Sequence, residues 1–140
     1  MRRTLILILA TAALVLGTAT AATAHTTGPP SGEPLFCISE QIVISCFEQD
    51  GDDFWVYDNE PDGRSAVVLW RTSYGRADEC RNSHGYGKWH ECTYDMAEGN
   101  PLGSTTVCWQ NYAVEFEVTP PDYNATSGTR CERISSLIET

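Results

Sequence analysis

The amino-acid sequence predicts an all-β fold, an antiparallel β-sandwich or small barrel of six to seven strands that is stapled by disulfides. Three observations lead to this fold class. Short runs alternate apolar and polar residues, turn residues separate those runs at regular spacing, and the chain holds six cysteines. No segment shows a long helical period, and this combination is typical of sandwiches and barrels.

The first expected hairpin covers residues 41–57. Residues 41–47 alternate in hydrophobicity with a period of two and include β-branched residues, which indicates a strand. The Asp50-Gly51 pair predicts a tight turn in which both residues take positive φ, with residues 54–57 as the returning strand. A second turn is expected directly after this strand.

Residues 65–72 are apolar at nearly every position, which indicates a strand in the centre of its sheet. Further strands are expected at residues 89–94, 105–109 and 113–119. In the last of these, the alternation predicts that Val114, Phe116 and Val118 point inward. Residues 130–137 fit a strand or a short helix, and we favour the strand because Cys131 must reach another cysteine.

The first 24 residues have the three parts of a secretory signal peptide. Two arginines precede an uncharged apolar run, and small residues then lead to an expected cleavage after Ala24. Residues 25–34 cannot bury a core and are expected to form a flexible arm. Residues 35–140 then form a single disulfide-rich β domain, and the protein is expected to be secreted and extracellular.

The six cysteines are expected to form three disulfides, because an exported chain meets an oxidising environment. Many connectivities are possible. We favour sequential pairing, because each pair then encloses a segment that can return to its start. The expected pairs are Cys37–Cys46, Cys80–Cys92 and Cys108–Cys131. No pair has the C-x-x-C spacing of a zinc knuckle or a thioredoxin-like site.

The charge balance excludes some partners. The chain carries 19 acidic against 9 basic residues and has a formal net charge of −10. Nucleic acid and anionic membranes both require clustered Lys and Arg, so neither is expected to bind. After the signal peptide, no segment approaches the roughly 20 apolar residues of a transmembrane helix. We expect an unknown extracellular partner and no cofactor.

Few residues could carry chemistry. The patterns G-x-S-x-G and H-E-x-x-H are both missing. His84 and His90 lie inside the expected Cys80–Cys92 loop, and three acidic residues are near them in sequence, namely Asp78, Glu79 and Glu91. A metal site or a His–carboxylate pair could form there. We favour ordinary surface loop residues, because two histidines without a third ligand are a weak motif.

His25 is a further candidate metal ligand. Cleavage after Ala24 would make it the N-terminal residue, whose amine and imidazole chelate Cu(II), and cleavage after Ala22 would place it third, in a square-planar copper or nickel site. Small exported β-sandwich copper proteins and copper monooxygenases begin with His, and the resemblance consists of this one residue and the fold class. We favour a histidine without a metal role.

A run of acidic residues could suggest a Ca²⁺ site, and it comprises Asp50, Asp52, Asp53, Asp58, Glu60 and Asp62. An EF-hand loop starting at Asp58 has Leu69 where a bidentate Glu is required. Turn formation explains these residues at least as well, and we favour it.

The four tryptophans and six tyrosines could form an exposed platform for sugar rings. We expect most of them to fill the core, above all Trp70. Trp55 and Tyr57 share one face of their strand, and apolar Phe54 and Val56 share the other. This strand is therefore either covered on both faces or presents an aromatic patch.

Several short motifs carry a resemblance to known proteins. They are Asp50-Gly51-Asp52, Asp62-Gly63-Arg64-Ser65 before Trp70, Cys80-Arg81-Asn82, Gly85-x-Gly87-x-Trp89 before Cys92, and Glu98-Gly99. Over most of residues 46–110 the chain resembles a group of small exported actinobacterial proteins that generally have no assigned function. The resemblance implies export and the two later disulfides. It implies no activity and no catalytic residue.

The leading hypothesis is a secreted, non-enzymatic β domain that acts by surface binding, because loops at the end of a sandwich are its usual binding sites. The expected contact surfaces are the hairpin of residues 50–62 and the Cys80–Cys92 loop. Within that loop the candidate contact residues are Asn82, Ser83, His84, Tyr86 and Lys88. Loss of the Cys80–Cys92 bond is expected to disorder the loop more than the sheet.

Two alternatives stay open. A small secreted protease inhibitor would present a disulfide-closed loop of this kind, although the reactive-site sequence of the subtilisin-inhibitor family is not found here. A metal-binding protein or enzyme, such as a copper-dependent oxidase or a hydrolase, would use His25, His84 or His90.

Overall fold

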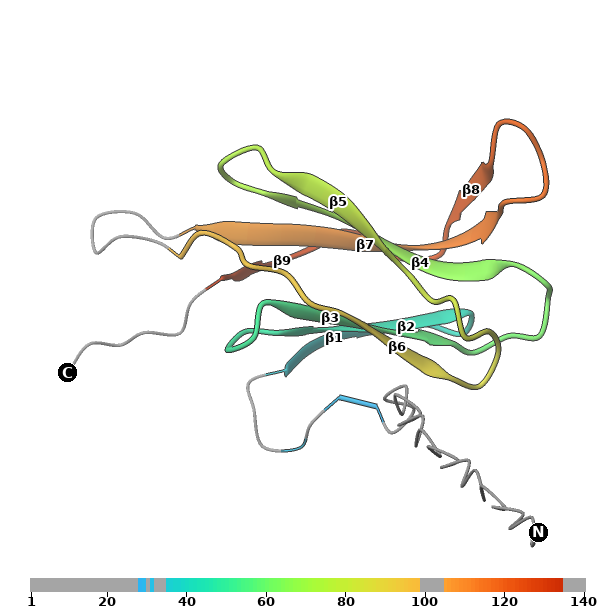
Figure 1. Ribbon diagram of the computed structural model, residues 1–140, viewed down its shortest axis with the longest axis horizontal. Coiled ribbons are helices and arrows are strands. Elements are labelled where there is room, and N and C mark those ends of the chain that lie inside the picture. Colours follow the sequence, from blue (N-terminus) through green and yellow to red (C-terminus); the bar gives the residue numbers. More distant parts are fainter. Residues whose placement is uncertain (1–27, 30, 32–34, 99–104, 135–140) are drawn as a thin grey trace, which may run out of the picture.

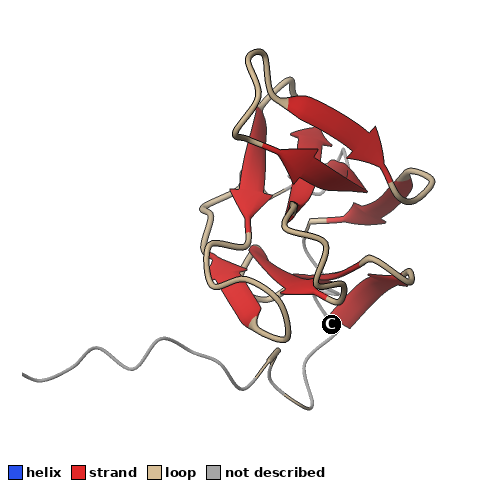
Figure 2. Ribbon diagram, turned by 90° about the vertical axis from the view of Figure 1, so that its right-hand side faces the viewer, coloured by secondary structure: helices blue, strands red, loops and turns tan. Residues whose placement is uncertain are grey.

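The computed structural model describes residues 28, 29, 31, 35–98 and 105–134. These residues form nine β-strands and no helix, in two antiparallel sheets of four and five strands (Figure 1). Figure 2 shows the two sheets as facing layers. The predicted antiparallel β-sandwich is confirmed, with more strands than the six to seven expected. The predicted signal peptide and His25 lie outside the described residues.

The first sheet has the strand order β1-β2-β3-β6. Its strands are β1 (Leu35–Ser39), β2 (Val43–Glu48), β3 (Asp53–Asp58) and β6 (Trp89–Cys92). Alternate residues of the two central strands point toward the second sheet. Val43, Phe47, Phe54 and Val56 are fully buried on this inner face.

The second sheet is built on two long strands, β4 (Ser65–Thr72) and β7 (Thr106–Glu115). One edge of β4 pairs with β5 (Ala77–Arg81), and its other edge pairs with β7. The outer edge of β7 is shared, because β9 (Arg130–Arg133) pairs with its first half and β8 (Asp122–Ala125) with its second half. The central position predicted for residues 65–72 is confirmed.

The core between the sheets is largely aromatic. Trp70 and Trp109 are almost fully buried and lie against Phe54, whose ring centroid is 6.2 Å from that of Trp70 and 5.6 Å from that of Trp109. The Phe47 ring is 5.1 Å from the Phe54 ring. Such ring pairs add about 0.5–1.5 kcal/mol beyond the area they bury. The expectation that Trp70 fills the core is confirmed.

A polar link crosses this core between the sheets. The Asn111 amide on β7 donates to the Val43 carbonyl on β2 at 3.0 Å, and its oxygen accepts from the Ser45 hydroxyl at 2.6 Å. The Trp109 indole donates to the same hydroxyl at 3.1 Å. Asn111 and Ser45 are fully buried, and these bonds satisfy their polar atoms.

The prediction of separate strands at 105–109 and 113–119 was wrong. One strand, β7, continues from Thr106 to Glu115, because polar Asn111 is turned into the core rather than marking a turn. The inward orientation expected of Val114, Phe116 and Val118 is wrong for all three, because strand alternation places Val114 on the outer face of the second sheet, opposite to Trp109 and Asn111, and β7 ends before Phe116. Val114 is fully buried, whereas Val118 lies beyond the end of β7 and is 46% exposed.

The β2–β3 hairpin forms as predicted, but its turn has a different conformation. Asp52 has the positive φ, at 56°, and Gly51 does not. The buried Asp52 carboxylate accepts a hydrogen bond from the Met96 amide at 2.9 Å. A contact with a distant segment therefore decides which turn residue adopts the left-handed conformation.

Three strands were not predicted, namely β1, β5 and β8. All three lie at sheet edges. Every residue of β8 is exposed, and Cys80 is the one buried residue of β5. An edge strand that water reaches on several sides lacks the apolar alternation from which a strand is recognised.

The three disulfides join the predicted cysteine pairs. Cys37–Cys46 links directly opposite residues of β1 and β2, and Cys108–Cys131 does the same for β7 and β9. Strand alternation places both on the outer faces of their own sheets. Cys80–Cys92 differs, because it joins β5 of the second sheet to β6 of the first.

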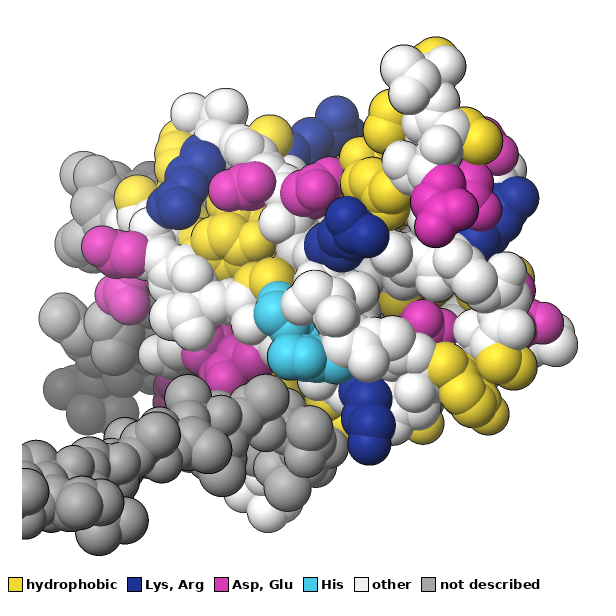
Figure 3. Space-filling view, turned by 45° about the vertical axis from the view of Figure 1, so that its right-hand side comes forward, with side chains coloured by type: hydrophobic (Ala, Val, Ile, Leu, Met, Phe, Trp, Pro, Cys, Tyr) yellow, Lys and Arg dark blue, Asp and Glu magenta, His cyan; other side chains and the backbone are white. Residues whose placement is uncertain are grey.

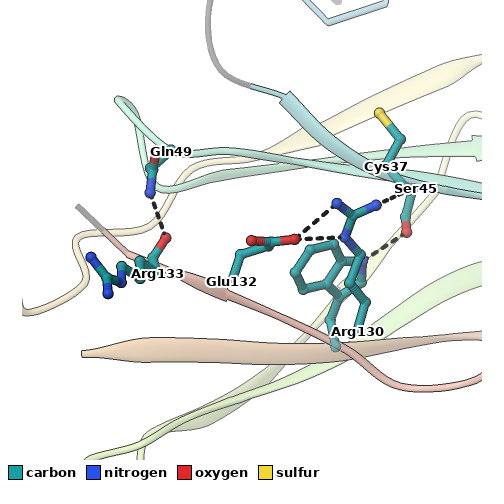
Figure 4. A network of polar contacts seen from close by, with 7 residues as sticks. Cys37, Ser45, Gln49, Arg130, Glu132 and Arg133 are labelled. Atoms are coloured by element: carbon teal, nitrogen blue, oxygen red, sulfur yellow. Dashed lines mark hydrogen bonds and ion pairs between the residues drawn. The ribbon is translucent and has the colours of Figure 1, made fainter. Parts of the chain in front are cut away.

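The opposite flank of the sandwich is closed by Arg130 of β9 (Figure 4). Its guanidinium donates to the Cys37 carbonyl of β1 at 2.6 Å and lies 5.6 Å from the Phe36 ring and 5.8 Å from the Trp109 ring. Glu132 accepts two further hydrogen bonds from this guanidinium, at 2.8 and 3.0 Å. One flank is thus held by a covalent bond and the other by an arginine.

A helix with the length and hydrophobicity that a membrane crossing needs is not found in the part of the chain that the structure describes.

Candidate functional site

Two loops meet at one end of the sandwich: the β3–β4 loop, residues 59–64, and the β5–β6 loop, residues 82–88 (Figure 1). β3 runs toward this end and the antiparallel β6 starts from it. The Gly87 amide donates to the Asp58 carbonyl at 2.8 Å, which ties the second loop to the start of the first. Two segments that the sequence analysis singled out separately therefore lie together.

Asn82 holds the β5–β6 loop in shape. Its side-chain nitrogen donates to the Val56 carbonyl at 3.1 Å and to the Lys88 carbonyl at 2.7 Å. Its side-chain oxygen accepts from the amides of His84 and Gly85, at 2.8 and 3.2 Å. Asn82 is 2% exposed, so this expected contact residue supports the loop from inside.

A pocket of about 250 Å³ lies between the two loops. Side chains from both loops and from the adjoining strand ends line it, among them Glu60, Arg64, Ser65, Arg81, Ser83 and Tyr86. Of the predicted contact residues, Asn82, Ser83 and Tyr86 line this pocket, whereas His84 and Lys88 do not. The Tyr86 side chain is 58% exposed and stands at its rim as an uncovered aromatic ring.

Two arginines on the pocket wall were not predicted. The Arg81 guanidinium lies 3.7 Å from the centroid of the Phe116 ring, and its Nε donates to the Ser65 hydroxyl at 3.2 Å. Arg64 is 3.9 Å from the Asp122 carboxylate, a long ion pair. The sequence does not show that Phe116 lies beside Arg81. The only signal for Arg81 as a pocket residue was its position next to Cys80 at the start of the disulfide-closed loop.

A second hollow of about 480 Å³ lies on the other side of the β3–β4 loop. It is bounded by the β1–β2 turn and by β8, and Arg64 lines both hollows. This end of the molecule is therefore indented on each side of one loop, with the Arg64 side chain between the two indentations.

The acidic wall of the pocket includes the buried residue Asp58. Burial raises the pKa of its carboxyl, the hydrogen bond from the Glu60 amide at 3.3 Å lowers it, and the charge of Asp62 raises it again. The pocket lining thus includes two arginines and a carboxylate that is partly shielded from water.

The two histidines that the sequence analysis singled out come together. Their ring centroids are 5.0 Å apart, and Figure 3 shows both histidines (cyan) side by side at the surface. His90 is half-buried and His84 is exposed. Burial lowers the pKa of His90 and the neighbouring His84 lowers it further, which keeps the ring neutral near pH 7.

Two of the three carboxylates near these histidines in sequence, Glu79 and Glu91, are directed elsewhere. Glu91 points to the opposite face of β6 from His90, as strand alternation requires. Glu79 accepts a hydrogen bond from the Tyr123 hydroxyl at 3.0 Å. Among the described residues, neither imidazole bonds to a carboxylate or a serine hydroxyl, so no His–carboxylate catalytic pair is assembled there.

The acidic run of residues 50–62 is divided between the two ends of β3. Asp50, Asp52 and Asp53 lie at or beside the β2–β3 turn, and the other three lie at the pocket end. A six-residue strand separates them by roughly 20 Å. The run therefore does not converge on one cation, and turn formation accounts for its members.

The outer face of the first sheet carries three further aromatic residues, Trp55, Tyr57 and Trp89. Trp55 is 4% exposed, and its indole donates to the Glu48 carboxylate at 2.9 Å. The rings of Tyr57 and Trp89 are 5.0 Å apart, and Gly28 lies directly against the Trp89 indole. At Trp55, β3 is therefore covered on its outer face as well as on its core face.

The fold and the site define a small β-sandwich with three disulfides and a loop-lined pocket at one end. No protein-family model, curated protein or solved structure matches this chain. The resemblance to small exported actinobacterial proteins stays a prediction.

Proposed function

We propose that the protein is a secreted, non-enzymatic binding module that holds a partner protein at the pocket between the β3–β4 and β5–β6 loops. The observation that carries the proposal is this pocket, lined by Arg64, Arg81 and the exposed Tyr86. Arginine and tyrosine are among the residue types that most often dominate the energy of protein–protein contacts. Loops on a rigid sandwich are its usual binding surfaces.

The pocket chemistry suits a partner segment that carries a carboxylate next to an apolar group. Guanidinium groups bind carboxylates through paired, charge-assisted hydrogen bonds. The Phe116 ring and the Ser65 hydroxyl hold Arg81 in place, so little side-chain freedom is lost when a partner binds. The apolar group would cover the Tyr86 ring at the rim.

Export is the part of the proposal that rests on the N-terminal sequence. The signal-peptide pattern of residues 1–24 predicts export, and three disulfides in a small domain are typical of proteins that work in an oxidising environment. The excess of acidic over basic residues favours a protein partner over nucleic acid.

The conformation of the β5–β6 loop favours a binding module over a protease inhibitor. A segment that mimics a substrate is extended, so that its backbone can add to an enzyme's sheet edge. Gly85 and Gly87 have φ values of 80° and 74°, which turn this loop back on itself. The compact loop suits the wall of a pocket better than a protruding substrate mimic.

The test is capture followed by titration. Immobilised protein is incubated with culture fluid from the producing cells, the retained proteins are identified, and each purified candidate is titrated by calorimetry. Tyr86→Ala and the Arg64→Ala/Arg81→Ala double variant are each expected to weaken binding at least about tenfold, or about 1.4 kcal/mol. Arg71→Ala, at another exposed arginine on β4, is the matched control and should bind like the wild type.

The proposal is wrong if every retained protein binds the pocket variants and the wild type with equal affinity. It is also wrong if nothing is retained by the wild type beyond what the double variant retains. Thermal unfolding of each variant checks that the sandwich is intact.

A further inference from the structure

The Cys80–Cys92 disulfide has two histidines beside it that the proposed function does not use. His90 and Cys92 are two residues apart on β6, so their side chains point to the same face. That face is turned toward Cys80 on β5, to which Cys92 is bonded. One ligand atom from each of these three side chains lies within 4.8 Å of the others.

His84 supplies a fourth side chain. Its backbone amide is fixed by the Asn82 oxygen at 2.8 Å, and its ring lies 5.0 Å from the His90 ring. Nδ1 of His90 is buried and has no hydrogen-bond partner among the described residues. The His84 ring therefore lies beside the group formed by His90 and the two sulfurs, next to His90, at the flank where the sheets are joined.

The other two disulfides provide an internal comparison. In the described segments, no histidine or carboxylate ligand atom lies close enough to join Cys37–Cys46 or Cys108–Cys131 in a metal-binding group. Among the three disulfides, the histidine pair accompanies the one that bridges the two sheets.

The chemistry of this cluster depends on the state of the sulfurs. In the disulfide they are bonded to each other and are poor metal ligands. A dithiol reductant breaks the S–S bond, is itself oxidised to a disulfide, and leaves two cysteine thiols. Binding of Zn²⁺ then releases one proton from each thiol and forms two Zn–S bonds. Two thiolates and two neutral imidazoles are a complete tetrahedral ligand set for zinc.

We propose that the reduced protein binds one Zn²⁺ ion through Cys80, Cys92, His84 and His90, so that the metal replaces the disulfide as the link between the sheets. Tetrahedral zinc places its donor atoms roughly 3.3–3.8 Å apart. The donors of Cys80, Cys92 and His90 already lie within 4.8 Å of one another. β5 and β6 are edge strands, so each can shift without breaking a second ladder.

This site is independent of the proposed binding function, because neither His84 nor His90 lines the pocket. The net charge of −10 also favours a cation at the surface over an anion.

The test uses the full-length protein, reduced under anaerobic conditions and freed of the reductant by gel filtration. Titration with Co²⁺ should give the absorption of tetrahedral thiolate-bound cobalt at one ion per chain, and Zn²⁺ should displace it. The Cys80→Ser/Cys92→Ser variant should lose this absorption. The Cys37→Ser/Cys46→Ser variant should keep it, and the oxidised wild type should not develop it.

The histidine ligands are tested separately. His84→Ala and His90→Ala should each lower the Zn²⁺ affinity of the reduced protein at least about tenfold. Lys88→Ala, in the same loop, is the matched control and should leave the affinity unchanged. If reduction unfolds the chain, near-ultraviolet circular dichroism replaces the affinity measurement, and Zn²⁺ should restore the tryptophan signal in the wild type but not in Cys80→Ser/Cys92→Ser.

Three results would overturn the proposal. One is an equal cobalt spectrum in the wild type and in Cys80→Ser/Cys92→Ser, which would place the metal on other thiols. Another is unchanged affinity in a His84→Ala/His90→Ala double variant. The third is equal Zn²⁺ affinity of the oxidised and the reduced protein. This result would show that the two surface imidazoles bind the metal without the sulfurs.

Discussion

The two flanks of the sandwich are closed by different chemistry. On one flank the short edge strands β5 and β6 are joined covalently by Cys80–Cys92. On the other flank Arg130 of β9 reaches β1 through one hydrogen bond and lies over two aromatic rings (Figure 4). The pocket-forming loop and the histidine pair both belong to the covalent flank.

The difference shows where this fold can carry exposed features. A disulfide lowers the entropy of the unfolded chain, so its effect does not depend on close packing around it. The arginine stabilises the folded state alone and needs its aromatic neighbours in place. The covalent flank can therefore support an open loop and a pocket, whereas the arginine flank consists of contacts that must stay closed.

Loss of the Cys80–Cys92 bond should have the largest effect. The chain-entropy treatment gives a loss of about 3 kcal/mol for the Cys80→Ser/Cys92→Ser variant, because the disulfide spans 12 residues. The structure changes the expectation that mainly the loop is disordered: the bond joins the sheets, and Asn82 holds the loop independently. Urea unfolding should show the loss, and hydrogen exchange should show the loop still protected.

Cys37→Ser/Cys46→Ser is the matched control, because its disulfide spans a similar 9 residues. The chain-entropy effect is again about 3 kcal/mol. Any further loss in Cys80→Ser/Cys92→Ser measures the link between the sheets. Equal losses in the two variants would remove the distinction between a disulfide within a sheet and one between sheets.

Asn82→Ala should destabilise the protein by about 2 kcal/mol, because it leaves the Val56 and Lys88 carbonyls without their buried donor. Hydrogen exchange should become faster for residues 83–87, and partner binding at the pocket should weaken. Asn124→Ala, at an exposed asparagine of β8, is the control and should change neither. A loop that stays protected in Asn82→Ala would assign its order to the disulfide instead.

Arg130→Met should cost about 1 kcal/mol, less than either change on the covalent flank. The variant keeps apolar contact with Phe36 and Trp109 but loses the hydrogen bond to the Cys37 carbonyl. Arg130→Lys should recover part of the loss, since an ammonium group can still donate to that carbonyl. A loss in Arg130→Met as large as that in Cys80→Ser/Cys92→Ser, measured by urea unfolding, would make the flanks equivalent.

A pH dependence is expected on the outer face of the first sheet. Burial raises the pKa of Asp53 from its ordinary 3.8 to about 6, helped by the charges of Glu91 and Glu48, while hydrogen bonds with Thr93 and Tyr94 lower it. The folded state therefore holds a proton that the unfolded state releases. Ionised Asp53 costs stability above about pH 6, and this cost disappears as the pH falls toward 4.

Asp53→Asn should accordingly raise the melting temperature at pH 7 and leave it nearly unchanged at pH 4. Thermal unfolding across this range measures the difference between the two proteins. A constant difference at every pH would show that the substitution acts by changing shape rather than charge. Glu40→Gln, at an exposed carboxylate of the β1–β2 turn, is the control and should leave the difference unchanged across this range.

Local residue patterns determined the central part of the fold. Alternating and β-branched residues were sufficient for β2, β3 and β4, because a strand covered on its core face requires apolar side chains at every second position. The three cysteine pairs could be predicted because each encloses a short segment. Part of the candidate site was also predictable, since Ser83 and Tyr86 belong to a loop closed by one of these pairs.

Tertiary contacts decided what such patterns could not show. The Met96 amide selects Asp52 as the left-handed residue of its turn, and the Val43 carbonyl and Ser45 hydroxyl draw Asn111 into the core. The contact between Arg81 and Phe116 joins two residues that are far apart in the sequence. No local preference of either segment encodes such a contact. The sequence by itself determined the central strands β2, β3 and β4. Only packing between the two sheets determined the edge strands and the side chains that meet at the pocket and beside the bridging disulfide. The physical reason is that periodicity acts over a few neighbours, whereas contacts between sheets depend on the whole fold.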